Sequence, residues 1–304
     1  MELGMIGLGK MGGFMTERLV KGGHRVVGFD RDAATVQRIA EKGAQGANSL
    51  ESLVSQLKPP RAIWLMVPSG APVDSTIAEL LPQLTEGDTI IDGGNSNYHD
   101  SMRRAAELKP KKINFVDVGT SGGVWGITEG YSMMVGGDAA VVERLSPIFK
   151  TLAPAPDKGW GRVGPVGAGH FVKMVHNGIE YGIMQAYAEG LDLLNHKKEF
   201  GLDLLQICKI WQFGSVIRSW LLDLTVDALE SNPKLEGVGA YVTDSGEGRW
   251  TAIEGIQLGV PLPVISAALE VRFRSQDPEP FANKLLAMMR HEFGGHAVQK
   301  VASK

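Results

Sequence analysis

The sequence has one cysteine, Cys208, in 304 residues, so it can form no intramolecular disulfide and no cysteine-rich zinc site. It also has no surplus of basic residues: 31 Lys and Arg stand against 34 Asp and Glu, a net charge of −3. This balance lacks the basic footprint of a nucleic-acid-binding protein. No run approaches the roughly 18 apolar residues of a membrane span, and no basic segment opens the chain. We therefore expect a cytoplasmic protein that binds no nucleic acid and no membrane.

Glycine is abundant, with 39 residues, and much of it lies in the first half, between short apolar runs. These runs are rich in Val, Ile, Met and aromatic residues, as buried strands are, and longer amphipathic stretches separate them. The alternation predicts an α/β domain with a Rossmann-type, doubly wound, mostly parallel sheet over residues 1–164. The expected strands are Met5 to Leu8, Arg25 to Phe29, Ala62 to Val67, Thr89 to Ile91, Ile113 to Val118 and Ser132 to Val135. The expected helices include Phe14 to Lys21, Asp32 to Lys42 and Val73 to Leu84.

The pattern changes after the segment Gly161 to Pro165, where strand signals nearly vanish and long helical periodicity begins with Ala168 to Asn195. We expect a second, all-helical domain over residues 165–304, with Pro261 and Pro263 marking a break between helices. Two domains also agree with the chain length, at about 150 residues per domain.

A glycine-rich motif, Gly7-Leu8-Gly9-Lys10-Met11-Gly12, follows the first predicted strand and precedes a helix. Such glycines allow a tight turn and a close approach to a pyrophosphate at the helix N-terminus. Asp30 ends the second strand 18 residues after Gly12, where a carboxylate can bind the adenosine ribose hydroxyls. Taken alone the motif is also typical of an ordinary turn, but its context predicts a dinucleotide site. Asp30 favours NAD over NADP, whereas Arg31 could pair with a 2′-phosphate or stack on adenine.

Two polar, glycine-rich clusters follow later strands, at Asp92 to Tyr98 and at Gly119 to Val124. Each cluster alone is more typical of a turn. In open α/β sheets, however, ligands bind at the carboxyl ends of strands, so the clusters are candidates for contacting nicotinamide and substrate.

The segment Gly167 to Tyr181 carries the strongest chemical signal. On a helix, Lys173, His176, Asn177 and Glu180 fall at positions i, i+3, i+4 and i+7 and share one face. A solvated Lys/Glu face would be the ordinary interpretation, but the intervening apolar residues predict a largely buried helix. Burial can lower the pKa of a lysine towards that of a useful general base, so we expect this face to be catalytic.

With these motifs in this order, the chain resembles the decarboxylating 6-phosphogluconate dehydrogenases of the short, NAD-preferring type, within the β-hydroxyacid dehydrogenase superfamily. The matching segments run the length of the chain in family order. They are GLGKMG at 7–12, IIDGGNSNY at 90–98, GTSGG at 119–123, GAGHFVKMVHNGIEYG at 167–182, GEGRWTAI at 246–253 and RHEFGGH at 290–296. Related hydroxyisobutyrate-type reductases keep the glycine loop and the lysine but lack the glutamate in its HNGIEY setting.

The resemblance implies a reaction that needs no metal ion. Lys173 would take the C3 hydroxyl proton of 6-phosphogluconate while hydride passes to the nicotinamide, and after loss of CO2 Glu180 would protonate the enediol. The resemblance assigns the sugar acid to Ser121, Gly122, Gly123, His176 and Asn177. It gives Asn95 contacts with both nicotinamide and substrate, and it places Val67 along the cofactor.

The resemblance also assigns phosphate recognition to Tyr181 and Arg272, and to a C-terminal pair, Arg290 and His296, that reaches the active site of another subunit. The last assignment implies a homodimer or tetramer, although these two residues could also be an ordinary basic helix end. The chain departs from the long-chain members in two places. Ser245 and Glu247 replace a lysine and a threonine that help to bind phosphate, and the helical domain lacks the second half of a duplicated bundle. Asp30 in place of asparagine supports NAD, with NADP the weaker cofactor.

Three other functions agree less well with these residues. A sister β-hydroxyacid dehydrogenase for a small unphosphorylated acid would not need Glu180, Arg272, Arg290 and His296 together. A non-catalytic NAD-binding sensor would be expected to have lost Lys173 or Glu180. A metal-dependent decarboxylating dehydrogenase would need clustered carboxylates, which the sequence does not suggest.

Overall fold

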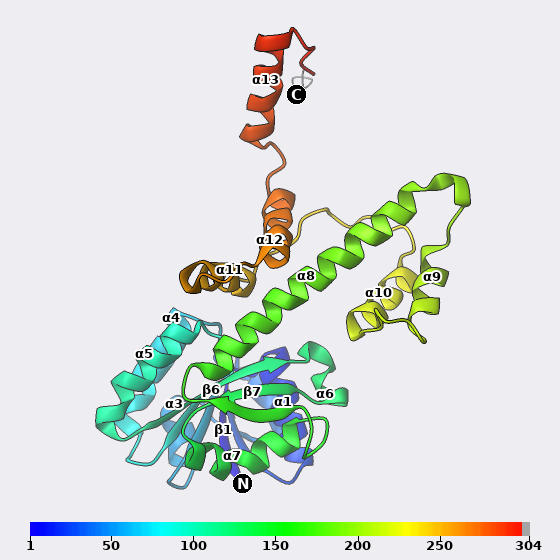
Figure 1. Cartoon of the computed structure of the whole chain (residues 1–304). Coiled ribbons are helices and arrows are strands. Elements are labelled where there is room, and N and C mark those ends of the chain that lie inside the picture. Colours follow the sequence, from blue (N-terminus) through cyan, green and yellow to red (C-terminus); the bar gives the residue numbers. More distant parts are fainter. Residues whose placement is uncertain (300–304) are drawn as a thin grey trace. The chain divides into compact units, whose positions relative to one another are not determined.

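The computed structural model describes residues 1–299 and divides the chain into two compact units, with the boundary after His176, inside one long helix. The first unit is an α/β domain and the second is helical, as the sequence predicts (Figure 1). The predicted domain boundary at residue 165 precedes this division, because the first turns of the long helix pack with the sheet.

The first unit contains one eight-stranded sheet with the strand order β3-β2-β1-β4-β5-β6-β7-β8. Strands β1 to β6 are parallel, whereas β7 is antiparallel to β6, and β8 is parallel to β7. The order reverses between β1 and β4, so this is the position at which ligands bind in doubly wound sheets. The strands are β1 (Glu2–Ile6), β2 (Arg25–Phe29), β3 (Gln45–Gly46), β4 (Ala62–Leu65), β5 (Thr89–Asp92), β6 (Asn114–Ser121), β7 (Ser132–Gly136) and β8 (Trp160–Gly164).

Helices cover both faces of this sheet because residues along a strand alternate between the faces. In β4, for example, Trp64 packs into one hydrophobic cluster and Ile63 and Leu65 into the other. The helices are α1 (Lys10–Lys21), α2 (Ala33–Ala40), α3 (Leu50–Ser55), α4 (Ala71–Leu80), α5 (Tyr98–Leu108), α6 (Gly126–Glu129) and α7 (Ala139–Leu152). Short 3-10 turns are η1 (Leu81–Gln83), η2 (Lys109–Lys111) and η3 (Gly123–Trp125).

Helix α8 (Ala168–His196) begins in the first unit and continues into the second. The second unit has two small hydrophobic clusters, one around Cys208 and Leu222 and one around Tyr181 and Leu269. Its other helices are η4 (Lys198–Phe200), α9 (Leu204–Trp211), α10 (Trp220–Ser231), α11 (Glu247–Leu258), α12 (Pro263–Gln276) and α13 (Phe281–Gly294). The gap between α11 and α12 confirms the helix break predicted at Pro261 and Pro263.

Two expectations about elements were wrong, and one strand was not predicted. The first strand ends at Ile6 rather than Leu8, because Gly7 has a φ of 89° and turns the chain. Strand β8 was not predicted, since Gly161 and Arg162 interrupt any apolar pattern. Helix α8 is buried at Lys173 and Met174, but Val172 and Ile179 are 37% and 52% exposed, so the helix is not largely buried.

Candidate active site

The loop between β1 and α1 presents its backbone to open space. A Cβ at Gly12 would lie 1.9 Å from the carbonyl oxygen of Gly7, so the first turn of α1 packs directly on the loop. Gly9 precedes α1, no side chain of residues 1–299 caps this end, and a Cβ at Gly9 would meet no atom within 4 Å. The N–H groups that begin α1 are therefore accessible to an anion such as a pyrophosphate.

A pocket of about 810 Å³ opens beside this loop. Its lining comes from the carboxyl ends of β1, β2, β4 and β5, the position that the strand order indicates. It includes nine residues that the sequence assigned to the cofactor: Gly7, Gly9, Lys10, Met11, Gly12, Asp30, Arg31, Val67 and Asn95.

A hydrogen bond between Leu8 and Asp30 connects two segments beside this pocket. The Leu8 side chain is fully buried in the core and does not line the pocket, in contrast to its neighbours in the motif. Its backbone N–H donates to Oδ2 of Asp30 at 2.7 Å, and the N–H of Asp32 donates to Oδ1 at 3.0 Å. The Asp30 carboxylate is thus fixed where β2 ends. An uncapped helix end, a fixed carboxylate and a pocket of this size together fit a nicotinamide dinucleotide.

A buried ion pair, which sequence reasoning missed, connects two loops that line the pocket. Arg104 on α5 is 1% exposed, and it donates to Asp92 Oδ2 at 3.2 Å, to Asp74 Oδ1 at 2.8 Å and to the carbonyl of Gly70 at 3.1 Å. Its hydrogen bond holds the pKa of the Asp74 carboxyl below its ordinary value. Asp92 in turn accepts hydrogen bonds from the N–H of Gly94 and the hydroxyl of Ser96.

Asn95 links the ends of β5 and β6. Its φ of 52° lies in the left-handed region, which asparagine tolerates better than most residues. Its Nδ2 donates to the carbonyl of Thr120 at 3.1 Å, and its Oδ1 accepts from the N–H of Thr120 at 2.9 Å. The two polar clusters predicted from the sequence therefore meet at the carboxyl ends of their strands.

The residues after Thr120 form the turn that leaves β6. Ser121 is the last residue of the strand and is half-buried. Gly122 and Gly123 have φ values of 123° and 52°, which favour glycine, and Gly123 is exposed. Their backbone N–H groups and the Ser121 hydroxyl lie at the edge of the sheet where ligands bind in this architecture.

Lys173 lies directly over β6. A Cβ placed on Gly119 would lie 2.4 Å from the Cβ of Lys173, so helix and strand touch at this point. The Lys173 side chain is 5% exposed, and its Nζ lies 3.3 Å from Nδ1 of His176. Asn177 and Glu180 follow on the same continuous helix and are half-buried. Helical spacing separates the positions of Lys173 and Glu180 by about 10 Å along the axis.

The second unit brings together two of the residues assigned to phosphate. The guanidinium of Arg272 lies 3.4 Å from the centre of the Tyr181 ring and donates to the carbonyl of Thr243 at 2.9 Å. The Tyr181 hydroxyl lies 3.2 Å from the hydroxyl of Ser245, which also donates to the carboxylate of Glu247. The carboxylate thus lies within the same hydrogen-bonded group as the tyrosine.

The C-terminal pair lies on and just after α13. Arg290 and His296 are exposed, and no residue of α13 is buried in the single chain. The ring of His296 contacts that of Phe293 with the ring centres 6.2 Å apart. The structure of one chain therefore leaves the assignment of Arg290 and His296 to a neighbouring site as a prediction.

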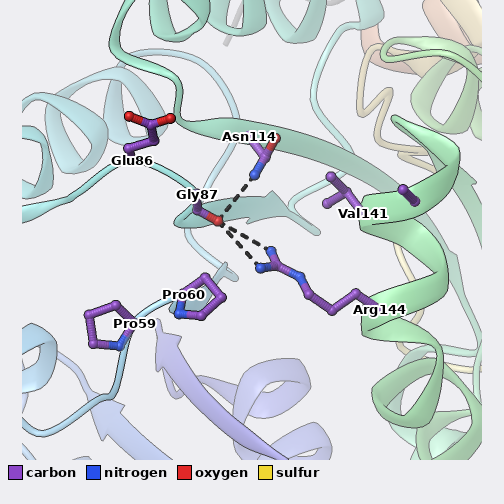
Figure 2. Close-up of a pocket in the computed structure, with 8 residues that line it drawn as sticks. Pro59, Pro60, Glu86, Gly87, Asn114, Val141 and Arg144 are labelled. Carbon is purple, nitrogen blue, oxygen red and sulfur yellow. Dashed lines mark hydrogen bonds between the residues drawn. The ribbon is translucent and has the colours of Figure 1, made fainter.

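Another pocket, of about 560 Å³, lies at the opposite, amino-terminal edge of the sheet. Figure 2 shows Arg144 and Asn114 pointing towards the carbonyl oxygen of Gly87, to which both donate hydrogen bonds. The Arg144 and Asn114 side chains, which could bind a ligand, already donate to this carbonyl oxygen. Ligands of doubly wound sheets bind at the other edge, where the strands have their carboxyl ends. We assign this pocket no function.

Residues 1–299 contain neither a cluster suited to a metal ion nor a helix suited to span a membrane. No group of three or more His, Cys, Asp or Glu side chains there is arranged to hold a metal ion. In the same part of the chain, no helix combines the length and the apolar character needed to cross a membrane.

Comparison with known proteins gives matches over both units. Residues 2–163 match the family described as the NAD binding domain of 6-phosphogluconate dehydrogenase, and residues 169–302 match the C-terminal domain of the same enzyme. The NAD(+)-dependent, decarboxylating 6-phosphogluconate dehydrogenase of Haloferax volcanii is 43% identical, over 99% of both chains.

Solved structures show the same relationship. The 6-phosphogluconate dehydrogenase of Plasmodium falciparum, solved in its apo form and in complexes with its cofactor NADP+ and its substrate 6-phosphogluconate, superposes with a TM-score of 0.83 and 28% identity. The match covers 100% of this chain and 67% of that one. A 3-hydroxyisobutyrate dehydrogenase of Mycobacterium tuberculosis shares the fold, with a TM-score of 0.72 and 22% identity over 90% of this chain and 92% of that one.

Proposed function

The chain belongs to the family of decarboxylating 6-phosphogluconate dehydrogenases, and on this premise we propose that it converts 6-phospho-D-gluconate to D-ribulose 5-phosphate and CO2 with reduction of NAD. The observation that carries the proposal is Lys173, buried against the carboxyl end of β6 on the helix that also carries Glu180. Base and acid are thus carried by one helix, and the base lies against the strand that ends at the proposed substrate site.

The cofactor would be held by the loop Gly7 to Gly12, by Asp30 and by Val67 and Asn95 along the pocket. When bound, its nicotinamide supplies the oxidising power by accepting hydride from C3 of the substrate. Asp30 supports a preference for NAD, because its carboxylate would accept hydrogen bonds from ribose hydroxyls and repel a 2′-phosphate. NADP would be the weaker cofactor, with Arg31, next to Asp30, as a cation that could favour it.

Lys173 begins the reaction as a neutral amine. It takes the proton of the C3 hydroxyl, so that the electron pair of the O–H bond can form the second C–O bond of the ketone as hydride leaves C3. The 3-keto acid then loses its carboxylate as CO2, and the ammonium of Lys173 stabilises the oxygen on which negative charge develops. His176 lies 3.3 Å from this amine and helps to orient it.

Glu180 completes the reaction as a general acid. As CO2 leaves, the Lys173 ammonium returns its proton to the C3 oxygen and an enediol forms. Glu180 then protonates the carbon that becomes C1 of the product while Lys173 takes the enediol O–H proton, which gives ribulose 5-phosphate. The base and the acid must be in different protonation states at one pH, which their different positions along α8 allow. The hydride leaves on the cofactor and the carboxylate leaves as CO2, and a proton passes from Lys173 back to Glu180 before the next turnover.

The substrate itself would be held by both polar clusters and by α8. Asn95, Ser121, Gly122 and Gly123 lie at the strand ends and would bind the carboxylate and hydroxyl groups, together with His176 and Asn177. Tyr181 and Arg272 would bind the phosphate, since the tyrosine hydroxyl can donate and the guanidinium supplies charge. Ser245 and Glu247 would contribute less than the lysine and threonine of long-chain members, so the arginine carries more of the phosphate recognition.

We also propose that the protein is at least a homodimer, in which Arg290 and His296 of one subunit complete the site of its neighbour. The exposed helix α13 supports this, because it presents large apolar side chains such as Phe281, Leu286 and Met289 that a single chain leaves uncovered.

A substrate comparison tests the proposed function. Rates of NAD reduction would be measured with 6-phosphogluconate, with unphosphorylated gluconate and with 3-hydroxyisobutyrate. We expect 6-phosphogluconate to be preferred by several orders of magnitude in kcat/KM, because a site built for a charged phosphate is left with unpaired groups when the phosphate is missing. A preference for 3-hydroxyisobutyrate would instead assign the chain to the sister dehydrogenases.

A further inference from the structure

A buried carboxylate in β6 holds the beginning of α8. Asp117 is fully buried in the middle of the strand. Its Oδ1 accepts a hydrogen bond from the N–H of Gly167 at 2.7 Å, and its Oδ2 accepts one from the N–H of His170 at 2.8 Å. These donors lie just before and within the first turn of the helix, where backbone N–H groups have no partner inside the helix. The sheet itself thus caps α8.

The cap brings helix and sheet into direct backbone contact. A Cβ on Gly169 would lie 2.4 Å from the carbonyl oxygen of Asp117 and 2.5 Å from that of Met134. A Cβ on Gly136 would lie 2.4 Å from Oδ1 of Asp117. No side chain fits between the first turn of α8 and strands β6 and β7. The distance between this turn and the sheet is therefore fixed by backbone contact.

A second contact fixes the same turn from the side. Nδ1 of His170 lies 2.8 Å from the hydroxyl of Ser101 on α5, and the imidazole is 1% exposed. Asp117 therefore holds the backbone of this residue while Ser101 holds its ring. The first turn of α8 is attached to two separate elements of the unit.

Burying a carboxylate is costly, even when it is hydrogen-bonded. Two backbone N–H groups and the positive end of the α8 dipole offset the cost, and an apolar residue at position 117 would avoid it altogether. Lys173 follows Gly169 by one helical turn and touches β6 at Gly119. The direction and height that Asp117 imposes on the first turn therefore decide where the lysine amine lies.

We propose that Asp117 is a positioning residue for Lys173: it sets the height and direction of the first two turns of α8, and so the place of the amine at the carboxyl end of β6. The inference rests on the proposed function, in which Lys173 is the base. It assigns Asp117 no contact with substrate or cofactor, so its loss acts on the chemical step and leaves dinucleotide binding intact.

The test is Asp117→Asn, with Asp88→Asn as the matched control. Asp88 is also fully buried and also accepts hydrogen bonds from two backbone N–H groups, those of Arg61 at 2.6 Å and Thr85 at 2.8 Å. It lies at the amino-terminal edge of the sheet, where it also pairs with the Arg61 guanidinium at 2.9 Å, so its replacement disturbs the fold at least as much. Both variants replace a buried carboxylate by an amide, so both lower the melting temperature. A purely structural role would make their effects on kcat alike.

For Asp117→Asn we expect kcat to fall about tenfold to a hundredfold, since a shift of about 1 Å at a reacting group can have this effect. The NAD dissociation constant, measured by titration without substrate, should stay within about twofold of the wild-type value on the same argument. Asp88→Asn should keep kcat. Equal losses of kcat in the two variants, or a weakened NAD affinity in Asp117→Asn alone, would overturn the proposal.

The Ser101→Ala variant and hydrogen exchange test the proposal in two further ways. If Asp117→Asn fails to fold, Ser101→Ala removes the ring contact of His170, together with a 3.5 Å bond to the Asn97 carbonyl, and should lower kcat with unchanged NAD affinity. An unchanged kcat there would count against the proposal. Hydrogen exchange needs no turnover: the amides from Gly167 to Lys173 should exchange faster in the variant. If these amides exchange faster in Asp117→Asn but the wild-type protein does not oxidise 6-phosphogluconate, then the function was misassigned and the attachment of α8 was not.

Discussion

At the scale of single residues, the account depends on what surrounds each ionisable group. Lys173 is almost fully enclosed, with His176 beside its amine and the backbone of β6 beneath it. Asp30 and Asp117 are held by backbone N–H groups rather than by cations. Each of these environments leads to a measurable expectation.

Lys173→Met should abolish turnover while leaving NAD binding intact. Removing a general base lowers kcat by about 10²-fold to 10⁴-fold, and the lysine does not line the dinucleotide pocket. Turnover and NAD titration of the same preparation give the two quantities. Lys150→Met, an exposed position on α7, serves as the control and should behave as wild type. If Lys173→Met kept a tenth of the activity, another group would have to be the base.

Asp30→Asn should shift the cofactor preference towards NADP. An amide still accepts the hydrogen bond from the Leu8 N–H, but it no longer repels a 2′-phosphate. We expect the ratio of kcat/KM for NADP to that for NAD to rise by at least about tenfold, which corresponds to about 1.4 kcal/mol. Glu41→Gln removes one charge at the C-terminal end of α2, outside the pocket lining, and should leave the ratio unchanged. An unchanged ratio in Asp30→Asn would transfer the discrimination to Arg31 or to other residues of the loop.

His24 should make folding stability depend on pH. Burial lowers the pKa of His24 below its ordinary value of 6.5, with a smaller contribution from the N-terminal amino group. Its Nε2 pairs with the hydroxyl of Thr151 at 2.9 Å, whereas its buried Nδ1 has no partner among residues 1–299. A second proton would therefore create a buried N–H with nothing to accept it.

The direction of this pH dependence follows from the proton that the unfolded chain binds at His24. Below pH 6.5 the unfolded state binds a proton at His24 that the folded state excludes, so this contribution to stability is complete above pH 6.5 and is lost as the pH falls towards the folded pKa. The urea midpoint of the wild type should drop from pH 7 to pH 5.5, and that of His24→Gln should drop less. Parallel declines in both proteins would show that other groups determine the pH dependence.

At the scale of elements, the sequence predicts well what depends on local pattern. Strand β2 and helix α8 have nearly the expected bounds, because apolar runs and helical periodicity are complete within each segment. Strand β8 was missed because its residues show no strand pattern of their own. It is a strand because it pairs with β7. Asp117 and Arg104 were missed for a similar reason. Their partners lie far away in sequence, and a lone aspartate inside the run Phe115 to Val118 was the available signal.

The contact between β6 and α8 should tolerate no added methyl group. In Gly119→Ala the new Cβ would lie 2.4 Å from the Cβ of Lys173 and 2.6 Å from the carbonyl oxygen of Gly169, so α8 must shift. Overpacking of this kind costs about 1–3 kcal/mol of stability, and the displaced lysine should lower kcat as well. Gly161→Ala in β8 meets no atom within 4 Å and is the control, with chemical unfolding and kcat as readouts. Wild-type behaviour of Gly119→Ala would mean that the strand and helix are further apart than described.

At the scale of the whole molecule, the uncovered helix α13 leads to a test of subunit exchange. Lys173→Met and Arg290→Ala protein should each be nearly inactive alone. If Arg290 acts on the neighbouring subunit, a mixed dimer contains one complete site, and random exchange of equal amounts restores roughly a quarter of wild-type activity. Light scattering would establish the oligomeric state of each sample. A mixture no more active than its components would place Arg290 in its own subunit's site or outside any site.

The most direct test of the central claim follows both products of one reaction. Wild-type protein would be given 6-phosphogluconate and NAD, with NADH followed by absorbance and CO2 trapped from the same vessel. The account predicts one CO2 for each NADH, and loss of both in Lys173→Met. NADH formation without CO2 would contradict the account, because it would mean that the helix carrying Lys173 and Glu180 oxidises its substrate but does not decarboxylate it.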